Sequence, residues 1–197
     1  AITARKEVSK NAAQLANYKD VWIFAEQRTG KVQNVAFELL AAGKELAEDR
    51  GCKLCAVLLG YKVSHLAQEL INHGADLVYV LDDPNLGEYE ADTYTDALDK
   101  LIQKHKPEII LAGATAIGRS FIARTAARVH TGLTADCTGL SIDKESFLLH
   151  QTRPAFGGNI MATIVTPHHR PQMATVRPGV FQQGEPDPNR KGKTLFE

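Results

Sequence analysis

The chain has 197 residues, of which 44% are hydrophobic and 23% are charged, so it is long enough to bury one globular core with an appendage. Lysine plus arginine and aspartate plus glutamate number 23 each, so the formal net charge is zero. The whole chain therefore has no net positive charge that would attract nucleic acid or an anionic membrane. No apolar run approaches the roughly 20 residues that span a bilayer, and the sequence AITARKEVSK has no signal-peptide core. We therefore expect a cytoplasmic protein that binds no nucleic acid and has no membrane insertion.

Four short β-rich runs alternate with longer helical runs in the first two thirds of the chain. The strands are expected at 21–26, 54–60, 77–81 and 109–113. In the intervening runs, apolar residues recur every three or four positions, which is typical of half-buried helices. The strands are apolar at nearly every position, so both faces of their sheet should be covered. The pattern predicts an α/β fold of three layers, with a mostly parallel, Rossmann-like sheet between helices.

The two ends of the chain differ from this central unit. Residues 1–20 are polar and are expected to form an amino-terminal arm. Beyond the last helical run the pattern changes to short β runs at 141–153, 159–167 and 172–178, which predict a hairpin or an edge extension of the same sheet near the carboxyl end. Residues 182–197, QQGEPDPNRKGKTLFE, are rich in proline, glycine and charge. We expect them to be a linker with little capacity to bury a core.

The three cysteines, Cys52, Cys55 and Cys137, cannot form a closed disulfide framework or an all-cysteine tetrahedral metal site within one chain. The CKLC spacing resembles a redox pair, but redox pairs lie where a helix begins, whereas this one opens the strand-like run LCAVLLG. Side chains three apart in a strand point to opposite faces. We therefore expect structural thiols in a reducing compartment.

The stretch GATAIGRS, residues 113–120, lies where a buried strand meets a helix. Ligands of parallel α/β sheets bind at that edge, where helix amino termini direct N–H groups outward. Thr115 is placed to cap the helix, Gly118 to allow a close approach, and Arg119 to reach an anion. The motif matches neither GxGxxG nor GxxxxGK[ST]. Direct contact with a phosphate and a plain strand-to-helix turn are therefore both open interpretations of this stretch.

Two later segments supply further polar candidates. HTGLTADCTGL contains Thr134 and Asp136, for which a ligand loop with Asp136 as a base and simple turn chemistry are both open. In TRPAFGGNI, Arg153 precedes small residues that let backbone pass close to a flat ring, and a surface ion pair is the alternative. His168 and His169 have no accompanying cysteine or carboxylate cluster, so no metal site is expected. The sequence also lacks a GxSxG motif, which argues against an independent hydrolase.

Six blocks then occur in an order that resembles one known family. They are VWIFAEQRTGKVQNVAFELLAAGKELA, AVLLG, GADLVYVLDDPNL, PEIILAGATAIGRSFIARTAARVHTGLTADCTGL, RPAFGGNIMATI and PQMATVRPGVF. Together they resemble the amino-terminal domain of the electron-transfer flavoprotein alpha subunit, over about residues 21–181. The resemblance implies a heterodimer with a beta subunit that holds AMP or, in bifurcating members, a second FAD. It also implies that the alpha subunit's own FAD is held by a carboxyl-terminal domain, expected after the linker and outside this sequence.

The resemblance also implies which residues lie toward the beta subunit and its nucleotide, namely those in 113–119, 134–138 and 153–158. The expected neighbours of a partner-held nucleotide or flavin are Gly113, Ala114, Thr115, Arg119, Thr134, Asp136, Arg153, Ala155, Phe156 and Gly157. A fixed cation or N–H donor beside a flavin stabilises its reduced, anionic ring. By itself the chain should not hold a dinucleotide tightly, and no independent catalytic activity is expected of it.

The first block is similar to that of the anaerobic, bifurcating members. Such members take a hydride from NADH, and the further partners implied are an acyl-CoA dehydrogenase-like or other flavin dehydrogenase and ferredoxin or flavodoxin. Two other interpretations stay open beside this one. The first is a stand-alone adenine-nucleotide-binding α/β module, which four βα units also suit. The second is a structural interaction domain whose loops touch no cofactor.

Overall fold

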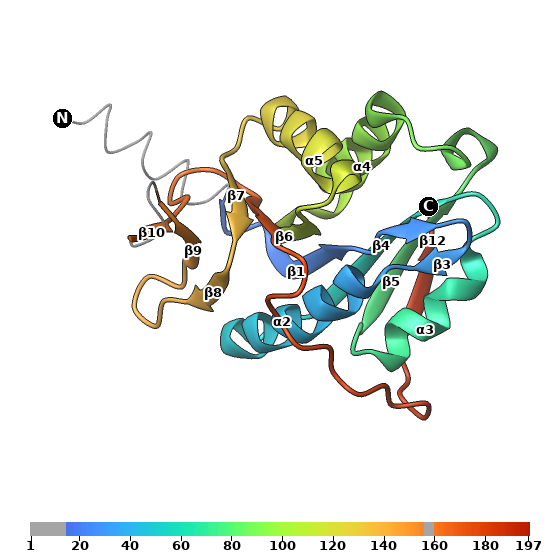
Figure 1. Ribbon diagram of the computed structural model, residues 1–197, viewed down its shortest axis with the longest axis horizontal. Coiled ribbons are helices and arrows are strands. Elements are labelled where there is room, and N and C mark those ends of the chain that lie inside the picture. The colour runs from blue at the N-terminus through green and yellow to red at the C-terminus, as the bar shows by residue number, and fades with distance from the viewer. Residues whose placement is uncertain (1–14, 156–159) are drawn as a thin grey trace.

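The computed structural model describes residues 15–155 and 160–197 of the chain (Figure 1). Its centre is a seven-stranded sheet with the strand order β12-β5-β4-β1-β6-β11-β7. The strands are β1 (Lys19–Phe24), β4 (Leu54–Gly60), β5 (Leu77–Asp82), β6 (Pro107–Gly113), β7 (Leu133–Cys137), β11 (Gln172–Val176) and β12 (Lys193–Phe196). All neighbours in this sheet run parallel, which confirms the predicted parallel α/β sheet.

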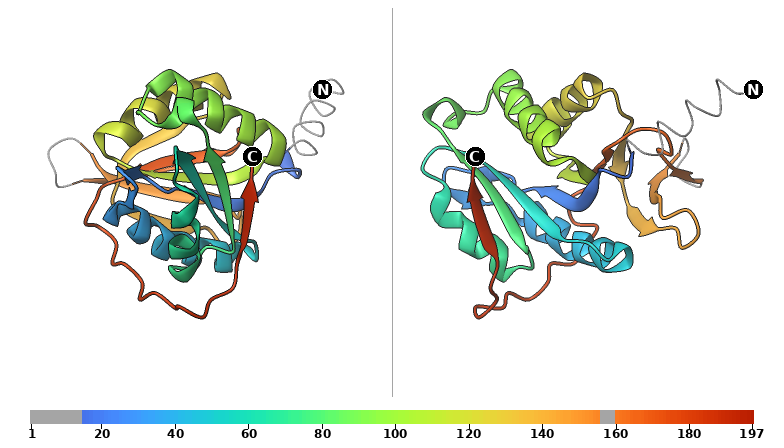
Figure 2. Two further views of the ribbon diagram at one scale, coloured as in Figure 1. Left: turned by 90° about the vertical axis from the view of Figure 1, so that its right-hand side faces the viewer. Right: turned by 180° about the vertical axis from the view of Figure 1, so that it is seen from behind.

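Helices cover both faces of this sheet, as the three layers in Figure 2 show. One face carries α2 (Asn34–Arg50) and α3 (Ala67–Asn72), and the other carries α4 (Ala91–His105) and α5 (Ala116–Arg128). Short 3-10 turns, η1 (Ser64–Leu66) and η2 (Pro84–Leu86), precede α3 and α4. The predicted three-layer arrangement is therefore confirmed.

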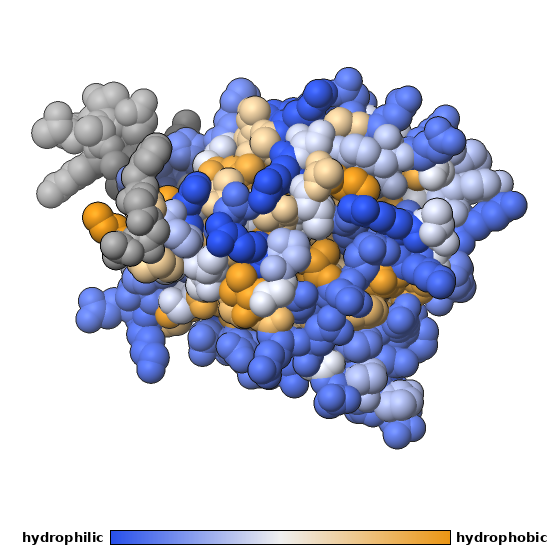
Figure 3. Space-filling model, viewed as in Figure 1, coloured by the Kyte–Doolittle hydropathy of each residue, from blue (hydrophilic) through white to orange (hydrophobic). Residues whose placement is uncertain are grey.

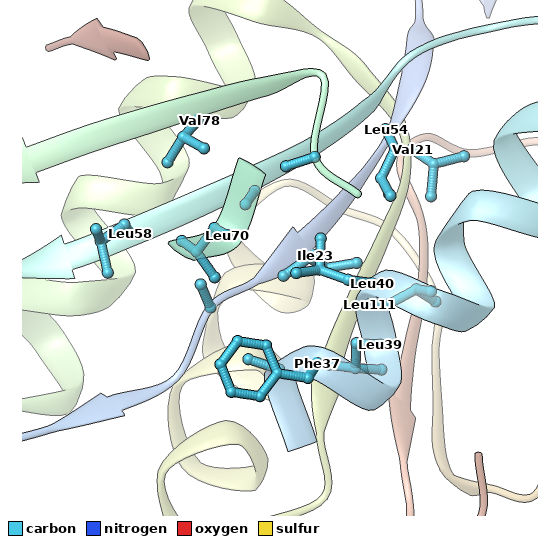
Figure 4. Close-up of a cluster of buried hydrophobic side chains, with 14 of the residues drawn as sticks. Val21, Ile23, Phe37, Leu39, Leu40, Leu54, Leu58, Leu70, Val78 and Leu111 are labelled. Carbon is cyan, nitrogen blue, oxygen red and sulfur yellow. The ribbon is translucent and has the colours of Figure 1, made fainter. Parts of the chain in front are cut away.

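The sheet divides the core into two apolar clusters. Successive strand residues point to opposite faces, so β1 sends Val21 and Ile23 toward α2 and sends Trp22 and Phe24 toward α4 and α5. Figure 4 shows the first cluster, in which Ile23 lies beside Leu40 of α2 and Val21 lies beside Leu54 of β4. Strands β4 and β6 are buried at every position. Burial on both faces accounts for the continuous apolar runs in their sequences.

The two cysteines of the CKLC stretch lie on opposite faces of the sheet, as expected. Cys55 belongs to the cluster under α4 and α5, and Cys52 packs at the margin of the cluster under α2. Burial raises the pKa of Cys55 far above the usual thiol range. Cys52, Cys55 and Cys137 are all free thiols in the part of the chain that the structure describes.

The carboxyl-terminal β runs differ in part from the expected extension of the main sheet. β8 (Gly139–Ile142), β9 (Leu149–Pro154) and β10 (Met161–Ile164) form a separate antiparallel sheet, which we call the small sheet. β11 instead lies inside the main sheet, between β6 and β7. The reason is visible in its sequence, QMATV, which is buried at every position as an interior parallel strand requires.

A buried polar network joins the small sheet to the main sheet. Glu108, at the start of β6, accepts hydrogen bonds from Arg170 Nε at 2.6 Å and from Gln172 Nε2 at 3.1 Å. Arg50 lies 3.4 Å from the same carboxylate and also donates to a carbonyl of the β8–β9 turn. Gln172 in turn accepts from the N–H of Leu149 in β9 at 2.9 Å. One carboxylate thus holds β6, the end of α2 and the small sheet together.

The predicted linker ends in a strand. Residues 177–192 pass α2 and α3 on the way from β11 to the opposite edge of the main sheet, where β12 pairs with β5 (Figure 1). Arg190 donates to Asp76 at 2.7 Å, and Glu197 forms an ion pair with Lys104. All four residues of β12 are exposed. Composition did not reveal this strand because its attachment rests on backbone pairing and ion pairs, which need no apolar core.

Candidate functional site

The predicted loop lies at the point where the order of the main sheet reverses. From β1 the chain passes through α2 to β4 on one side, whereas β6 lies on the other side of β1. In parallel α/β sheets, ligands bind in the crevice outside the carboxyl ends of such a pair of strands. The stretch 113–120 leaves the end of β6 and begins α5 at this place. The sequence therefore placed the loop correctly.

The packing of the chain itself accounts for both glycines of the loop. A Cβ on Gly113 would lie 2.7 Å from a methyl group of Val35, at the start of α2. A Cβ on Gly118 would overlap the carbonyl oxygen of Gly113. Thr115 is the N-cap of α5, and its hydroxyl accepts the N–H of Gly118 at 3.0 Å, as predicted. Ala114 donates its N–H to Val176 of β11 at 2.7 Å. These contacts make a tight strand-to-helix turn.

A buried carboxylate that the sequence analysis did not single out occupies the crevice. Glu26, just beyond β1, is 1% exposed. Its Oε2 accepts the Thr115 hydroxyl at 2.5 Å, and its Oε1 accepts Arg28 Nη2 at 2.9 Å. Arg28 lies in a small hairpin of β2 (Gln27–Arg28) and β3 (Lys31–Val32). An acidic residue directly after an apolar strand was the available signal, because such a residue enters the crevice.

The open space beside Glu26 is small. It measures about 180 Å³ and is walled by Phe24, Leu59, Tyr89, Tyr94 and Ile117. The hydroxyl of Tyr94 donates to the carbonyl of Leu86 at 3.2 Å, so it is not directed at a ligand. Binding sites for small molecules usually measure about 300–1,000 Å³. The crevice, as the described residues form it, therefore does not fit a flavin or other dinucleotide.

Two predicted residues meet at the neighbouring end of β7. Arg119 of α5 and Asp136 of β7 form an ion pair at 2.8 Å. Asp136 has a φ of 57°, and its N–H donates a hydrogen bond to the hydroxyl of Thr175 in β11 at 3.1 Å. The pair joins α5 to the edge strand of the main sheet. Thr134, two residues earlier, is buried within β7, and its backbone pairs with that of Ala174 in β11.

Arg153 lies on the inner face of the small sheet. In β9 it shares its side with Leu149 and Gln151, both of which are buried. Burial raises the pKa of the Cys137 thiol in β7 to about 11, and the positive charge of Arg153 acts in the opposite direction. Arg153 is therefore close to the end of β7, near the Arg119–Asp136 pair. This position argues against a wholly solvent-facing arginine.

Of the remaining predicted residues, Ala155 directly follows β9. Ala155 donates its N–H to Ile160 at 2.7 Å and so closes the turn toward β10. Phe156 and Gly157 lie outside the described residues. The structure thus brings together the residues around Thr115 and Arg119 with Asp136, and it sets Arg153 on the adjoining sheet. Their role as neighbours of a nucleotide or flavin stays a prediction.

Comparison with known proteins supplies the identity that the geometry leaves open. A family model described as "Electron transfer flavoprotein domain" matches residues 21–194. The chain belongs to the electron transfer flavoprotein family. The match includes the resemblance predicted over 21–181 and extends into the segment that ends in β12. The family assignment from the six sequence blocks is therefore confirmed.

Several curated relatives within the electron transfer flavoprotein family are similar over most of this chain. The "Electron transfer flavoprotein subunit alpha" of Thermoanaerobacterium thermosaccharolyticum is 54% identical over 91% of this chain and 54% of its own length. The "Acryloyl-CoA reductase electron transfer subunit beta" of Anaerotignum propionicum is 46% identical over 89% of this chain and 54% of its own length. The "Lactate dehydrogenase (NAD(+),ferredoxin) subunit LctC" of Acetobacterium woodii is 44% identical over 91% of this chain and 43% of its own length. The chain spans about half the length of these relatives.

The electron transfer flavoprotein family consists of flavoproteins, which agrees with the predicted dependence on a flavin. None of the helices in the described part of the chain is long and apolar enough to cross a membrane. The same described residues contain no cluster of histidine, cysteine or carboxylate side chains that could hold a metal ion.

Proposed function

We propose that this chain is the amino-terminal part of an electron-transfer flavoprotein alpha subunit. In that role it supports flavin-based electron transfer without holding the flavin itself. The single observation that carries the proposal is the family match over residues 21–194. The crevice supports it, because it is too small for a flavin. FAD, held by the beta subunit and by further alpha-subunit sequence, would supply the redox chemistry. The residues of this chain would supply the packing contacts and pairing interactions that orient the flavin.

The small sheet supports the expected association with a beta subunit. Its edge strand β10 exposes apolar side chains, with Met161 54% and Ile164 39% exposed, and Ile160 beside it is 64% exposed. Figure 3 shows an apolar spot at the left of the molecule, where Figure 1 places β10. An apolar edge strand with free backbone groups is suited to pairing with another polypeptide. We propose that the beta subunit covers this edge.

The predicted site residues fit a supporting role beside that partner. The Arg119–Asp136 pair and Arg153 stand at neighbouring ends of β7 and β9. Arg153 has no anionic side chain as a hydrogen-bonded or ion-paired partner within the described residues. It is therefore the best candidate in this group to face an anionic part of the nucleotide or flavin of the beta subunit.

The names of relatives extend the proposal to the wider electron path. One relative is named as an acryloyl-CoA reductase electron transfer subunit and another as part of an NAD- and ferredoxin-dependent lactate dehydrogenase. We propose that the complete protein works in the cytoplasm with NADH as donor in a bifurcating complex. Its partners would be a flavin dehydrogenase, such as an acyl-CoA dehydrogenase-like enzyme, and ferredoxin or flavodoxin.

Co-expression with the beta subunit of the same complex tests the proposed association. The heterodimer should form and be seen by light scattering after gel filtration. The double variant Met161→Lys with Ile164→Lys should weaken it by at least about tenfold, because two charges would enter an apolar contact. Leu195→Lys is the matched control, since Leu195 is 40% exposed on the edge strand β12 of the other sheet. A chain that forms no heterodimer would contradict the proposal.

The alternative of a stand-alone adenine-nucleotide module is tested separately. Calorimetric titration of this chain with AMP, an adenine nucleotide without a diphosphate, should give no micromolar binding, because the crevice measures only about 180 Å³ and Arg28 and Thr115 already bind Glu26. Micromolar binding without a partner would favour the module instead. A purely structural domain is distinguished by Arg153→Ala in the complete complex, since it predicts no change of the flavin potential.

A further inference from the structure

A second pocket lies at the amino-terminal edge of the main sheet, away from the crevice at Glu26. It measures about 410 Å³. Its walls come from the residues before β1, the ends of α4 and α5, and the loop between β10 and β11. These segments gather at the same end of the molecule, as Figures 1 and 2 show. Nothing in the proposed electron-transfer role uses this pocket.

The pocket is lined by basic side chains and by no acidic one. Its basic residues are Lys106, His130, His168, His169 and Arg170. All except Arg170 are exposed. Within the described part of the chain, these four exposed side chains are in no ion pair. Their charge is therefore available to a ligand.

Arg170 is held rigidly at the wall of the pocket. Its Nε donates to Glu108 at 2.6 Å, and its Nη1 donates to the carbonyls of Thr166 at 3.0 Å and His169 at 2.9 Å. The loop that presents His168 and His169 is thereby fixed to the start of β6. A loop fixed in this way loses less conformational entropy when it binds a ligand.

Helix capping explains only part of this basic group. Lys106 and His130 follow α4 and α5 with φ values of 52° and 56°, and positive side chains are favoured at helix carboxyl ends. His168, His169 and Arg170 belong to the loop between β10 and β11 and follow no helix. Compensation of a helix dipole therefore does not account for them.

The balance of charges favours an anion. The carboxyl ends of α4 and α5 contribute roughly −0.5 each. Glu108 faces both Arg50 and Arg170, which leaves about one positive charge, and Lys106 adds another. The other polar groups facing the pocket, on Asn17, Tyr18 and Gln103, are uncharged. The sum is about +1 with the three histidines counted as neutral.

We propose that this pocket binds a small molecule bearing a diphosphate group. Metal binding is not supported, because the described residues include no suitable group of three ligands. The volume of about 410 Å³ lies within the range of small-molecule sites. The basic residues come from separate segments and surround a hollow, which suits a small molecule. Binding to the flat surface of an acidic protein would need no hollow. Ammonium, imidazole and amide N–H groups together suit the several acceptor oxygens of a diphosphate.

Calorimetric titration of the full chain with inorganic pyrophosphate at low salt tests this site. We expect one saturable site whose affinity falls as salt is added, because salt screens the attraction between charges. The double variant His168→Ala with His169→Ala should weaken binding by roughly tenfold. His65→Ala, another exposed histidine, is the control and should leave the affinity unchanged.

Circular dichroism of the double variant should match that of the parent chain, because both histidines are exposed loop residues. Equal pyrophosphate affinity in the parent and the folded double variant would overturn the proposal. So would the lack of saturation at millimolar pyrophosphate. Binding of a polyglutamate peptide without binding of pyrophosphate would also overturn it, in favour of an acidic protein partner.

Discussion

In the main sheet, β4, β6 and β11 are buried at every position, whereas three of the four residues of β10 in the small sheet are exposed. The main sheet has helices on both faces and so completes its own core. The small sheet buries its inner residues Leu149 and Gln151 but leaves its edge strand open. The difference indicates which region maintains the fold and which is available to a partner.

The largest effect is expected where the two sheets are joined. Glu108→Ala should lower the free energy of unfolding by about 3–5 kcal/mol, because Arg50 and Arg170 would lose their shared carboxylate while remaining largely buried. Urea denaturation measures the change. Glu108→Gln is the control that keeps the shape and should cost less. A loss below about 1 kcal/mol for the alanine variant would mean that the network does not hold the sheets together.

A pair of alanine substitutions sharpens the comparison within the sheets themselves. Leu111→Ala in β6 should cost about 2–5 kcal/mol, because it leaves a cavity in a fully buried cluster. Ile164→Ala in β10 should change stability by no more than about 0.5 kcal/mol, since its side chain is largely in water in the isolated chain. Similar losses for the two variants would refute the contrast between a closed sheet and an open one.

A smaller effect is expected at the turn after β6. Thr115→Ala removes the N-cap of α5 and the hydrogen bond to Glu26, and should cost about 1–2 kcal/mol in thermal or urea unfolding. Thr115→Ser retains the hydroxyl and serves as the control. If serine and alanine are equally destabilising, the hydroxyl contacts are not what stabilises this turn.

The smallest effect is expected at β12, and it depends on pH. Hydrogen bonds from Lys104 and then His105 lower the pKa of Glu197. A lowered folded-state pKa gives stability that is present above the ordinary glutamate value of about 4.3 and is lost as pH falls through the lowered value. The amides of Leu195 and Glu197 should therefore lose protection against exchange with solvent, relative to unstructured amides at the same pH, below about pH 4. Glu197→Gln should abolish this dependence, whereas Glu185→Gln, at an exposed position nearby, should not.

The sequence predicted most of the main sheet because its signals are local. The strand expected at 54–60 has the same bounds in β4, since apolar residues stop at a turn on both sides. β1 begins two residues earlier than expected, at Lys19, because a polar residue at a strand end can pair without being buried. The Thr115 cap was likewise readable from a threonine three residues before a glycine in a helix start.

Features that depend on distant partners were not predictable from such local patterns. The position of β11 is set by its pairing with β6 and β7, and the local sequence QMATV does not specify which strands it pairs with. The Glu26–Thr115 hydrogen bond joins residues 89 positions apart, so the closure of the crevice was missed. Arg153 was identified as a candidate, but its place on the inner face depends on the register of the small sheet.

The pairing of β12 with β5 has a consequence for synthesis. The Arg190–Asp76 contact at this edge joins residues 114 positions apart, so β5 leaves the ribosome long before its neighbour does. Until then the nascent polypeptide exposes β5 as an unpaired edge strand. Unpaired edge strands allow nascent chains on the same mRNA to aggregate. The emergence of β12 is thus the step that removes this hazard.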